Sequence, residues 1–438
     1  MKKLLTGAAI IDVTPQKPLF LHGYPHVERI SEGTHDPLYA SALVIDNGEN
    51  QIGLCTVDVI YITKEITNQV RKSVHEKTGI PEQNLMISAT HTHSGPIIFD
   101  DLFYDPVVPK ADAEYLSYLT DKLVDVYVKA FKNKRESKIA FTIADGTGVG
   151  GNRRSVTDAI DKEVPVLVFK DAATDKITAL STIYCMHPTV LHEDSKLYSA
   201  DFPGYTRDYL RNKLNDDAVI LYHTGPSGNQ SPRHFVKSNT FDEAQRLGYL
   251  LGERIMERVQ KLSDSDFQEW VPLDVRSDHV MLPKKEFMSV EEAESKRIQA
   301  KEKLENLRAS KAPATEIRTA EVDWFGAEER RQLAEMAANG ELEKVYQALL
   351  PIEISVISIG NNRFVFLPGE LFVEYSLMIK EKSPNTFVVS LSNGVLAGYI
   401  VTEEAEKEGG YEASNGIFPA KAGQLIVKKA LALLKNMG

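Results

Sequence analysis

The sequence is poor in cysteine and has no excess of positive charge. Cys55 and Cys185 are its two cysteines, and both lie in apolar stretches, GLCTV and IYCMH, where a small buried thiol is expected. We therefore expect no disulfide framework. Acidic residues outnumber basic ones by 62 to 51, and the formal net charge is -11. A chain of this charge lacks the positive field that holds nucleic-acid phosphates, which argues against nucleic acid as a partner.

Long hydrophobic runs are also missing. No apolar run approaches the roughly 18 residues that identify a membrane-spanning helix. The start, MKKLLTGAAIIDVTP, places two lysines before the apolar stretch Leu4 to Ile11, as a secretion signal does. Asp12 interrupts that stretch, and no small-residue cleavage site precedes it. We interpret it as a first strand, and we expect a soluble, cytoplasmic protein without a transmembrane segment.

What the sequence does contain is typical of a globular α/β protein, with 42% hydrophobic and 26% charged residues in a chain of 438. Short apolar stretches predict strands at 40–46, 51–60, 84–89, 138–144, 164–169, 178–185, 218–222, 353–359, 363–367 and 386–391. Longer stretches with helical periodicity lie at 63–78, 112–132, 203–215, 241–262, 370–381 and 420–436. Their mixture predicts a layered α/β fold. RFVFLPG after ISVISIGNN indicates an antiparallel hairpin, so we expect a mixed β-sheet flanked by helices.

Residues 284–348 differ in composition, being rich in Lys, Glu, Ala and Leu. The pattern predicts helices separated by Ala312-Pro313 and by a Phe-Gly break. We interpret the segment as a helical insertion, a solvated arm on the main domain. Without a repeat or a low-complexity linker, residues 1–438 form one predicted domain.

One glycine motif imitates a nucleotide-binding loop. GTGVGG places Gly146, Gly148 and Gly151 in the GxGxxG spacing after a predicted strand. A dinucleotide site needs a helix directly afterwards, but the β-branched NRRSVTDAIDKEVPVLVF follows instead. We interpret the motif as a glycine turn.

Histidines occur where predicted strands end. In NLMISATHTHSGP, His91 and His93 are two residues apart, so on a strand they would share one face at its end. The spacing leaves two readings open, a metal or catalytic site and a pair of hydrogen-bonded turn histidines. His187 follows another apolar strand in TIYCMHPTVL. Glu370, in FVFLPGELF, is predicted in the first turn of a helix, where an acid is also stabilised by the helix dipole. Two histidines and one carboxylate form a common catalytic zinc set.

Taken together, these stretches resemble the catalytic domain of the neutral/alkaline non-lysosomal ceramidase family. The similar segments occur in family order from about residue 6 to residue 430: GAAIIDVTP, HDPLYASALVID, SATHTHSGP, GNRRS, MHPTVL, SADFPGY, GNQSPR, LPGELF and AGYIVTEEAEKEGGYEAS.

The resemblance implies a zinc-dependent hydrolase that cleaves the amide between a fatty acid and a sphingoid base. It makes His91, His187, Glu370 and Tyr399 the expected metal ligands. It places His93 and Arg153 beside the scissile carbonyl, with His93 as a proton donor that titrates near the working pH. It equates Ser231 with the family's active-site serine, as nucleophile or as substrate holder.

The sequence departs from the family pattern in two respects. Family ceramidases carry a signal or membrane association and an additional C-terminal domain, and we expect neither in this sequence. Gly228-Asn229-Gln230-Ser231-Pro232-Arg233 replaces the usual Gly-Asp-Val-Ser-Pro-Asn, which removes an acid and adds a cation. Alternatives therefore stay open: a metal-dependent hydrolase of a small non-lipid amide or ester, a metal-independent serine hydrolase using Ser231, and a non-catalytic binding protein.

Overall fold

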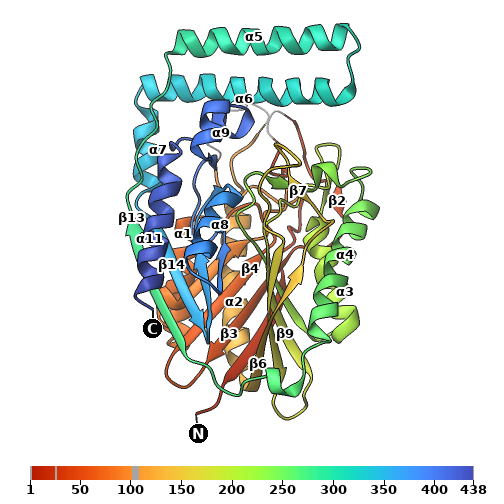
Figure 1. The fold of residues 1–438 in the computed structure, drawn as a ribbon, viewed down its shortest axis with the longest axis vertical. Coiled ribbons are helices and arrows are strands. Elements are labelled where there is room, and N and C mark those ends of the chain that lie inside the picture. Colours follow the sequence, from red (N-terminus) through yellow and green to blue (C-terminus); the bar gives the residue numbers. More distant parts are fainter. Residues whose placement is uncertain (1, 25–26, 101–107, 438) are drawn as a thin grey trace.

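The computed structural model describes residues 2–24, 27–100 and 108–437, and shows two β-sheets packed face to face between layers of helices (Figure 1). The larger sheet has the strand order β11-β9-β8-β6-β1-β3-β4-β5. β4 runs parallel to β5 and β9 parallel to β11, whereas the other pairs are antiparallel. Its strands are β1 (Leu5–Asp12), β3 (Tyr39–Asp46), β4 (Gln51–Val57), β5 (Leu85–Ala89), β6 (Arg135–Asp145), β8 (Glu163–Asp171), β9 (Ile177–Tyr184) and β11 (Val219–Thr224). The predicted mixed sheet flanked by helices is confirmed.

The predicted C-terminal hairpin is also present, but it belongs to a second sheet. β14 (Ile352–Ile359) pairs antiparallel with β15 (Asn362–Phe366) through a tight turn at Gly360-Asn361. β13 (Leu273–Val280) and β17 (Thr386–Val389) complete the order β13-β14-β15-β17. β13 was not predicted, because its sequence LDVRSDHV is largely polar and only Leu273 in it is buried.

Apolar side chains fill the space between the two sheets. Helices cover one face of the large sheet and the small sheet covers the other, so the sequences of its strands are nearly continuous apolar runs. The inner layer includes Leu43, Leu54 and Phe169 from the large sheet, and Ile357 and Phe366 from the small one.

Helices cover the outer faces. The larger sheet packs against α1 (Lys64–Thr78), α2 (Ala113–Lys132), α3 (Asp201–Leu214) and α4 (Phe241–Val259). The smaller sheet packs against α8 (Val373–Lys382) and α11 (Lys421–Lys435). Short elements lie in the connections: β2 (Gly33–Thr34), β7 (Gly151–Asn152), β10 (Leu197–Tyr198), β12 (Gln230–Ser231), β16 (Glu370–Leu371), β18 (Tyr399–Ile400), α9 (Glu403–Glu408), α10 (Tyr411–Asn415) and three single 3-10 turns at Glu82–Asn84, Pro232–His234 and Asp264–Asp266.

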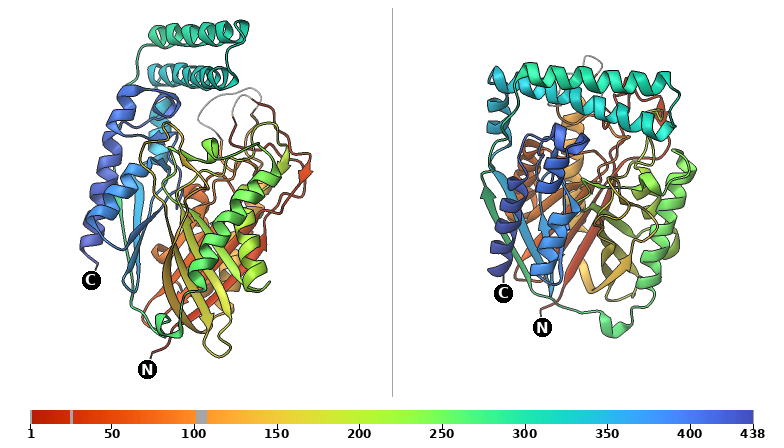
Figure 2. Two further views of the ribbon diagram at one scale, coloured as in Figure 1. Left: turned by 45° about the vertical axis from the view of Figure 1, so that its right-hand side comes forward. Right: turned by 45° about the horizontal axis from the view of Figure 1, so that its top comes forward.

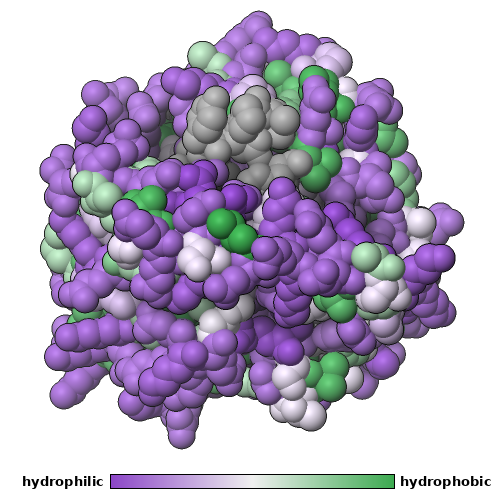
Figure 3. All heavy atoms as spheres, turned by 90° about the horizontal axis from the view of Figure 1, so that it is seen from above, coloured by the Kyte–Doolittle hydropathy of each residue, from purple (hydrophilic) through white to green (hydrophobic). Residues whose placement is uncertain are grey.

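The segment interpreted as a helical insertion forms three helices, which lie between the two strands of a β-hairpin. β13 pairs with β14 up to Val280 opposite Ile352, and the chain between them forms α5 (Val290–Ala309), α6 (Ala314–Ala338) and α7 (Glu341–Leu349). α5 and α6 lie side by side across one end of the molecule (Figure 2). Seen from that end, the surface is mostly hydrophilic (Figure 3).

Two sequence interpretations in this part of the chain have different outcomes. The expected Phe-Gly break at Phe325-Gly326 is wrong, because α6 continues through it. A methyl group at Gly326 would lie 3.3 Å from the Cβ of Ser414, so the glycine serves close packing against α10. The glycine turn in GTGVGG is confirmed: β6 ends at Asp145, and Thr147 pairs with Gly150 in a bridge, without a following helix.

No helix within the described ranges combines the length and the apolar character needed to cross a bilayer.

The core between the sheets gives a first prediction. Ile357 is fully buried there, whereas Ile298 on α5 is 43% exposed. We expect Ile357→Ala to lower the free energy of unfolding by about 2–5 kcal/mol, because it removes buried methyl groups and leaves a cavity. Ile298→Ala, the same chemical change at an exposed helical position, should cost less than about 1 kcal/mol. Urea denaturation followed by circular dichroism measures both, and equal losses would contradict the inter-sheet core.

Candidate metal centre

The carboxyl ends of strands from both sheets meet at one edge. The hydroxyl of Thr224, which ends β11, donates to the carbonyl oxygen of Thr90 beyond β5, at 2.8 Å. The amide of Ser390, beyond β17, donates to the carbonyl oxygen of Thr224 at 2.9 Å. The amide of Gly225 donates to the carbonyl oxygen of Tyr184 at the end of β9. Residues that follow these strands are therefore brought together, although they are distant in the sequence.

His91 and His93 lie in this region, but not on a strand as expected. β5 ends at Ala89, and His91 has a φ of 69°, in the left-handed region. Its amide still donates to the carbonyl oxygen of Val59, which fixes the turn. The two imidazole rings nevertheless converge, with centroids 4.9 Å apart. The turn, rather than the alternation of a strand, brings them to the same place.

His187 approaches from the end of β9 and is fully buried. Its Nδ1 lies 2.6 Å from the carbonyl oxygen of Ser227 and 3.1 Å from that of Gln230. Since carbonyl oxygens only accept, Nδ1 carries the proton, and Nε2 presents its lone pair. His91 has the same arrangement, with Nδ1 2.8 Å from the carbonyl oxygen of Ile60. Backbone carbonyls commonly orient metal-binding histidines in this way.

Glu370 completes the convergence. Its Oε2 lies 2.9 Å from His187 Nε2 and 3.3 Å from His91 Nε2, while the hydroxyl of Tyr61 donates to Oε1. The expected position in a first helical turn is wrong: Glu370 lies in the short strand β16, and α8 begins at Val373. β16 pairs parallel with β18, which places Glu370 opposite Tyr399.

The donor set fits a bound cation. Burial, and secondarily the charge of Arg153, lower the pKa of His187 to about 4, so its imidazole is neutral at pH 7. A lone pair on Nε2 then faces a carboxylate oxygen at 2.9 Å, and two acceptors at that distance repel unless a cation lies between them. Within the described residues, His91 Nε2 is likewise buried without a hydrogen-bond partner.

His93 lies close enough to join the same site. One ring nitrogen from each of His91, His93 and His187 lies within 4.8 Å of the others, so this buried cluster can bind a metal. Neither ring nitrogen of His93 has a hydrogen-bond partner among the described residues. Burial, with the neighbouring His91 and His187, holds the pKa of His93 well below its ordinary value. Gly23 makes room for this ring, because a side chain there would overlap His93.

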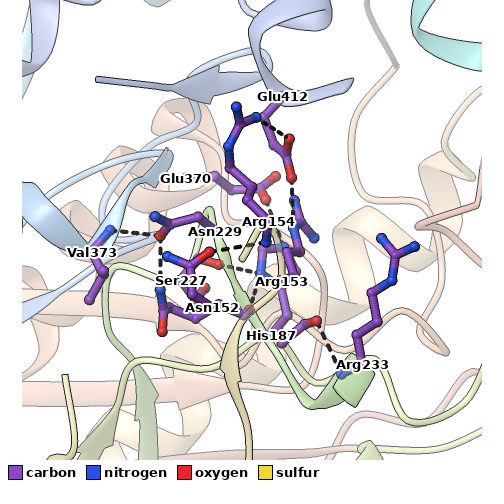
Figure 4. Close-up of polar contacts among 12 residues, drawn as sticks. Asn152, Arg153, Arg154, His187, Ser227, Asn229, Arg233, Glu370, Val373 and Glu412 are labelled. Atoms are coloured by element: carbon purple, nitrogen blue, oxygen red, sulfur yellow. Dashed lines mark hydrogen bonds and ion pairs between the residues drawn. The ribbon is translucent and has the colours of Figure 1, made fainter. Parts of the chain in front are cut away.

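Arg153 and Tyr399 form the neighbouring wall. The guanidinium of Arg153 lies 5.2 Å from the centre of the Tyr399 ring, and its Nε donates to Glu412 at 2.8 Å. Figure 4 shows the carboxylate of Glu412 held by both Arg153 and Arg154. Burial and the charge of Glu370 raise the pKa of Tyr399, although Arg153 opposes that shift. Tyr399 is therefore a neutral phenol in this structure.

Ser231 directly follows Gln230, which contacts His187, but the Ser231 hydroxyl itself makes no hydrogen bond with the histidines among the described residues. It lies in β12, paired with Gly151 of β7, and its Oγ accepts the amide of Arg233 at 3.3 Å. No histidine is hydrogen-bonded to this hydroxyl among the residues that the structure describes. The carbonyl of the preceding Gln230 instead faces His187.

Several supporting residues were not found from the sequence. Asn229 links the site to α8: its carbonyl accepts the amide of Arg153, and its side chain contacts Val373 and Glu374 (Figure 4). Asp58 binds Arg207 through two hydrogen bonds of 2.8 and 2.6 Å and accepts the hydroxyl of Thr90, which precedes His91. Asn229 lies in the GNQSPR segment, where only Ser231 was singled out, whereas Asp58 carries no motif of its own. The sequence offered one signal for Asp58: an acidic residue that directly follows an apolar strand, here β4.

A pocket with a solvent-accessible volume of about 90 Å³ lies beside the candidate metal centre. Its lining combines aromatic and acidic side chains, including His22, Tyr24, His93, Phe99, Glu329, Glu370, Tyr399 and Tyr411. This lining suits a substrate with an apolar part and a polar reacting group.

Comparison with known proteins identifies the family. The family model described as neutral/alkaline non-lysosomal ceramidase, N-terminal, matches residues 4–239. The chain belongs to the neutral/alkaline non-lysosomal ceramidase family. This membership accounts for the similar segments found in the sequence, and the match includes His91, His93, Arg153, His187 and Ser231.

The individual ceramidases that match this chain have low sequence identity to it. Neutral ceramidase A of Dictyostelium discoideum is 27% identical over 239 residues, which cover 50% of this chain and 33% of that protein. Neutral ceramidase of Pseudomonas aeruginosa is 24% identical over 283 residues, covering 56% of this chain and 41% of that protein. The aligned region thus spans less than half the length of these relatives. The crystal structure of the Pseudomonas aeruginosa neutral ceramidase matches with a TM-score of 0.78 at 19% identity, over 100% of this chain and 75% of that one, which shows a shared fold.

The Glu412 contacts predict a pH dependence of stability. Burial opposes ionisation of Glu412, but Arg153 and Arg154 hold its pKa below the ordinary value. Glu412 therefore binds a proton more readily in the unfolded chain than in the folded protein. Its ionised carboxylate contributes fully to the free energy of unfolding above about pH 4.5, and this contribution is lost as the pH falls below that value. We expect wild-type protein to lose more unfolding free energy between about pH 6 and pH 3.5 than Glu412→Gln does. The matched control is Glu408→Gln, an exposed contact of Arg154, which should behave like wild type. Identical pH profiles for wild type and Glu412→Gln, measured by denaturant titration, would contradict this assignment.

Proposed function

We propose that the chain is a zinc-dependent amidohydrolase that cleaves the amide bond of ceramides, between a fatty acid and a sphingoid base. The observation that carries this proposal is the buried approach of His91 Nε2, His187 Nε2 and one oxygen of Glu370, which provides three ligand atoms for one cation. Two histidines and one carboxylate are a common catalytic zinc set, and they leave a position for water. Family membership supports the ceramide substrate.

Tyr399 is the proposed fourth ligand. Its support is the pairing of β16 with β18, which places it opposite Glu370, and its ring centroid 6.4 Å from that of His187. Phenolate is an unusual ligand, because burial stabilises the neutral phenol. Arg153, directly over the ring, favours the anionic form, and a divalent cation would favour it further.

A zinc ion bound here would polarise the substrate carbonyl and lower the pKa of water towards neutrality. The chain supplies the remaining functions. His93, neutral and without a hydrogen-bond partner in the described structure, can accept a proton and then deliver it to the leaving amine. Nη2 of Arg153 is buried and has no partner among the described residues, so it can donate to a developing oxyanion. One such donor typically contributes about 10²–10³ in rate.

Ser231 fits a structural or substrate-holding part better than that of a nucleophile. An activated serine needs a base within hydrogen-bond distance, whereas Ser231 Oγ accepts a backbone amide. The serine and its neighbours also hold the carbonyl of Gln230 against His187.

Replacing one ligand should remove the metal. We expect His91→Ala to lose bound zinc and amidase activity together, because its Nε2 is a primary ligand. Ser231→Ala and the exposed His279→Ala should both keep about one zinc per chain. Metal analysis of the purified, dialysed proteins by mass spectrometry gives the result, and stoichiometric zinc in His91→Ala would refute the ligand assignment.

Removing the metal should stop turnover reversibly. We expect chelator-treated protein to release no fatty acid from a short-chain ceramide, and zinc addition to restore the activity, since no protein side chain replaces the Lewis acid. Short N-acyl amines and esters assayed in parallel define the substrate range. Undiminished hydrolysis in chelator would support the serine mechanism, and metal-loaded protein inert toward the whole panel would indicate a binding protein.

A further inference from the structure

Three consecutive residues of the connection that follows β4 contact two of the proposed metal ligands. The carbonyl oxygen of Val59 accepts the amide of His91, and that of Ile60 lies 2.8 Å from Nδ1 of the same histidine. The hydroxyl of the next residue, Tyr61, donates to Oε1 of Glu370. His91 follows a strand of the large sheet, whereas Glu370 follows a strand of the small one. One short connection thus joins ligands that come from different sheets.

The contact of Tyr61 with Glu370 is made by a side chain, unlike the two carbonyl contacts with His91, so a substitution can remove it alone. A carboxylate only accepts hydrogen bonds, so the tyrosine hydroxyl is the donor. It occupies Oε1, while Oε2 lies 2.9 Å from His187 Nε2 and 3.3 Å from His91 Nε2. One oxygen of Glu370 is therefore held by the protein, and the other faces the nitrogens that would bind the cation.

Neighbouring rings hold the phenol of Tyr61 in this direction. Tyr61 is half-buried, and its ring lies edge-on to those of His91 and Phe99, with centroids 5.3 Å apart in both pairs. The ring of His22 is a third neighbour, with its centroid at 6.1 Å. Aromatic pairs prefer such edge-to-face arrangements over direct stacking. Packing therefore restricts the ring that presents its hydroxyl to Glu370.

We propose that Tyr61 is a positioning residue, which orients Glu370 so that Oε2 points toward Nε2 of His91 and of His187. This inference rests on the metal centre of the proposed function, and it adds to that centre a residue that acts through one of the ligands. Side chains that hydrogen-bond to a metal ligand fix its orientation, and their loss typically weakens metal affinity about 10- to 100-fold. Tyr61 thereby determines how tightly the site binds zinc.

Zinc affinity measures this role without an assay of turnover. We expect Tyr61→Phe to weaken zinc binding at least about 10-fold, because the ring and its packing stay while the donor to Glu370 is lost. The matched control is Tyr127→Phe, which removes a fully buried hydroxyl that donates to the carbonyl oxygen of Met86 in the large sheet, at 2.6 Å. It should keep the zinc affinity within about 2-fold of wild type. Competition with a chromophoric zinc chelator gives both values.

A second comparison determines whether Tyr61 acts through Glu370. Glu370→Ala removes the ligand but leaves the cluster of three imidazoles, which can bind zinc more weakly. In that background Tyr61→Phe should change the zinc affinity by less than about 2-fold, because the hydroxyl has lost the group that it orients. An equal loss of affinity with and without Glu370 would instead show a general effect on the fold, and would overturn the proposal.

Unchanged zinc affinity in Tyr61→Phe, or an equal loss in Tyr127→Phe, also overturns the proposal. Wild-type protein that binds zinc but hydrolyses no amide refutes the proposed function alone, and these titrations still decide the role of Tyr61. Wild-type protein that binds no divalent metal refutes both. If Tyr61→Phe does not fold, as judged by circular dichroism, Tyr61→Met takes its place, because methionine fills irregular space and has no donor. The same loss is then expected, and unchanged affinity again overturns the proposal.

Discussion

The site depends on the contact between His187 Nε2 and a carboxylate oxygen of Glu370, 2.9 Å apart in a buried environment. Two carbonyl oxygens hold the proton on Nδ1 of His187, and a third orients His91 in the same way. Lone pairs are thereby directed toward one point, where they would repel each other without a positive charge. The free energy of bringing these acceptors together must come from the surrounding fold.

The fold provides this free energy because strands of both sheets end close together at the same side of the molecule. Hydrogen bonds among Thr90, Thr224 and Ser390 tie strands of both sheets together, and the buried pair of Asp58 and Arg207 supports the turn that carries His91. Breaking such a buried pair by removing one partner commonly costs about 3–5 kcal/mol. The proposed metal ligands lie in short turns and short strands such as β16, and the sheets beneath them set their positions.

The sequence predicted the strongly periodic parts well. Apolar strands such as β3, β4 and β9 and amphipathic helices such as α2 were found nearly at their observed bounds, because both faces of the sheet are buried and the helices have one apolar side. β13 was missed, since an exposed edge strand carries little apolar signal. The division into two sheets depends on long-range pairing, which local periodicity does not encode.

The candidate site was found through residue types rather than through geometry. His91, His187 and Glu370 were selected because each follows an apolar strand, yet the expected local conformations of His91 and Glu370 were wrong. A left-handed residue and a two-residue strand arise from tertiary contacts, so neither has a sequence pattern. The buried acid Glu329, which lines the pocket, could not be distinguished in the sequence from the other acids of α6, because its burial depends on tertiary contacts.

β13 and β14 remain in register on either side of the connection that holds α5, α6 and α7. The pairing of β13 with β14 therefore does not depend on which residues form the connection between them. The entropic cost of closing the connection rises only slowly with its length, by about 0.6 kcal/mol for each doubling. The segment between β13 and β14 can consequently change without moving the proposed metal ligands, which lie on other parts of the chain.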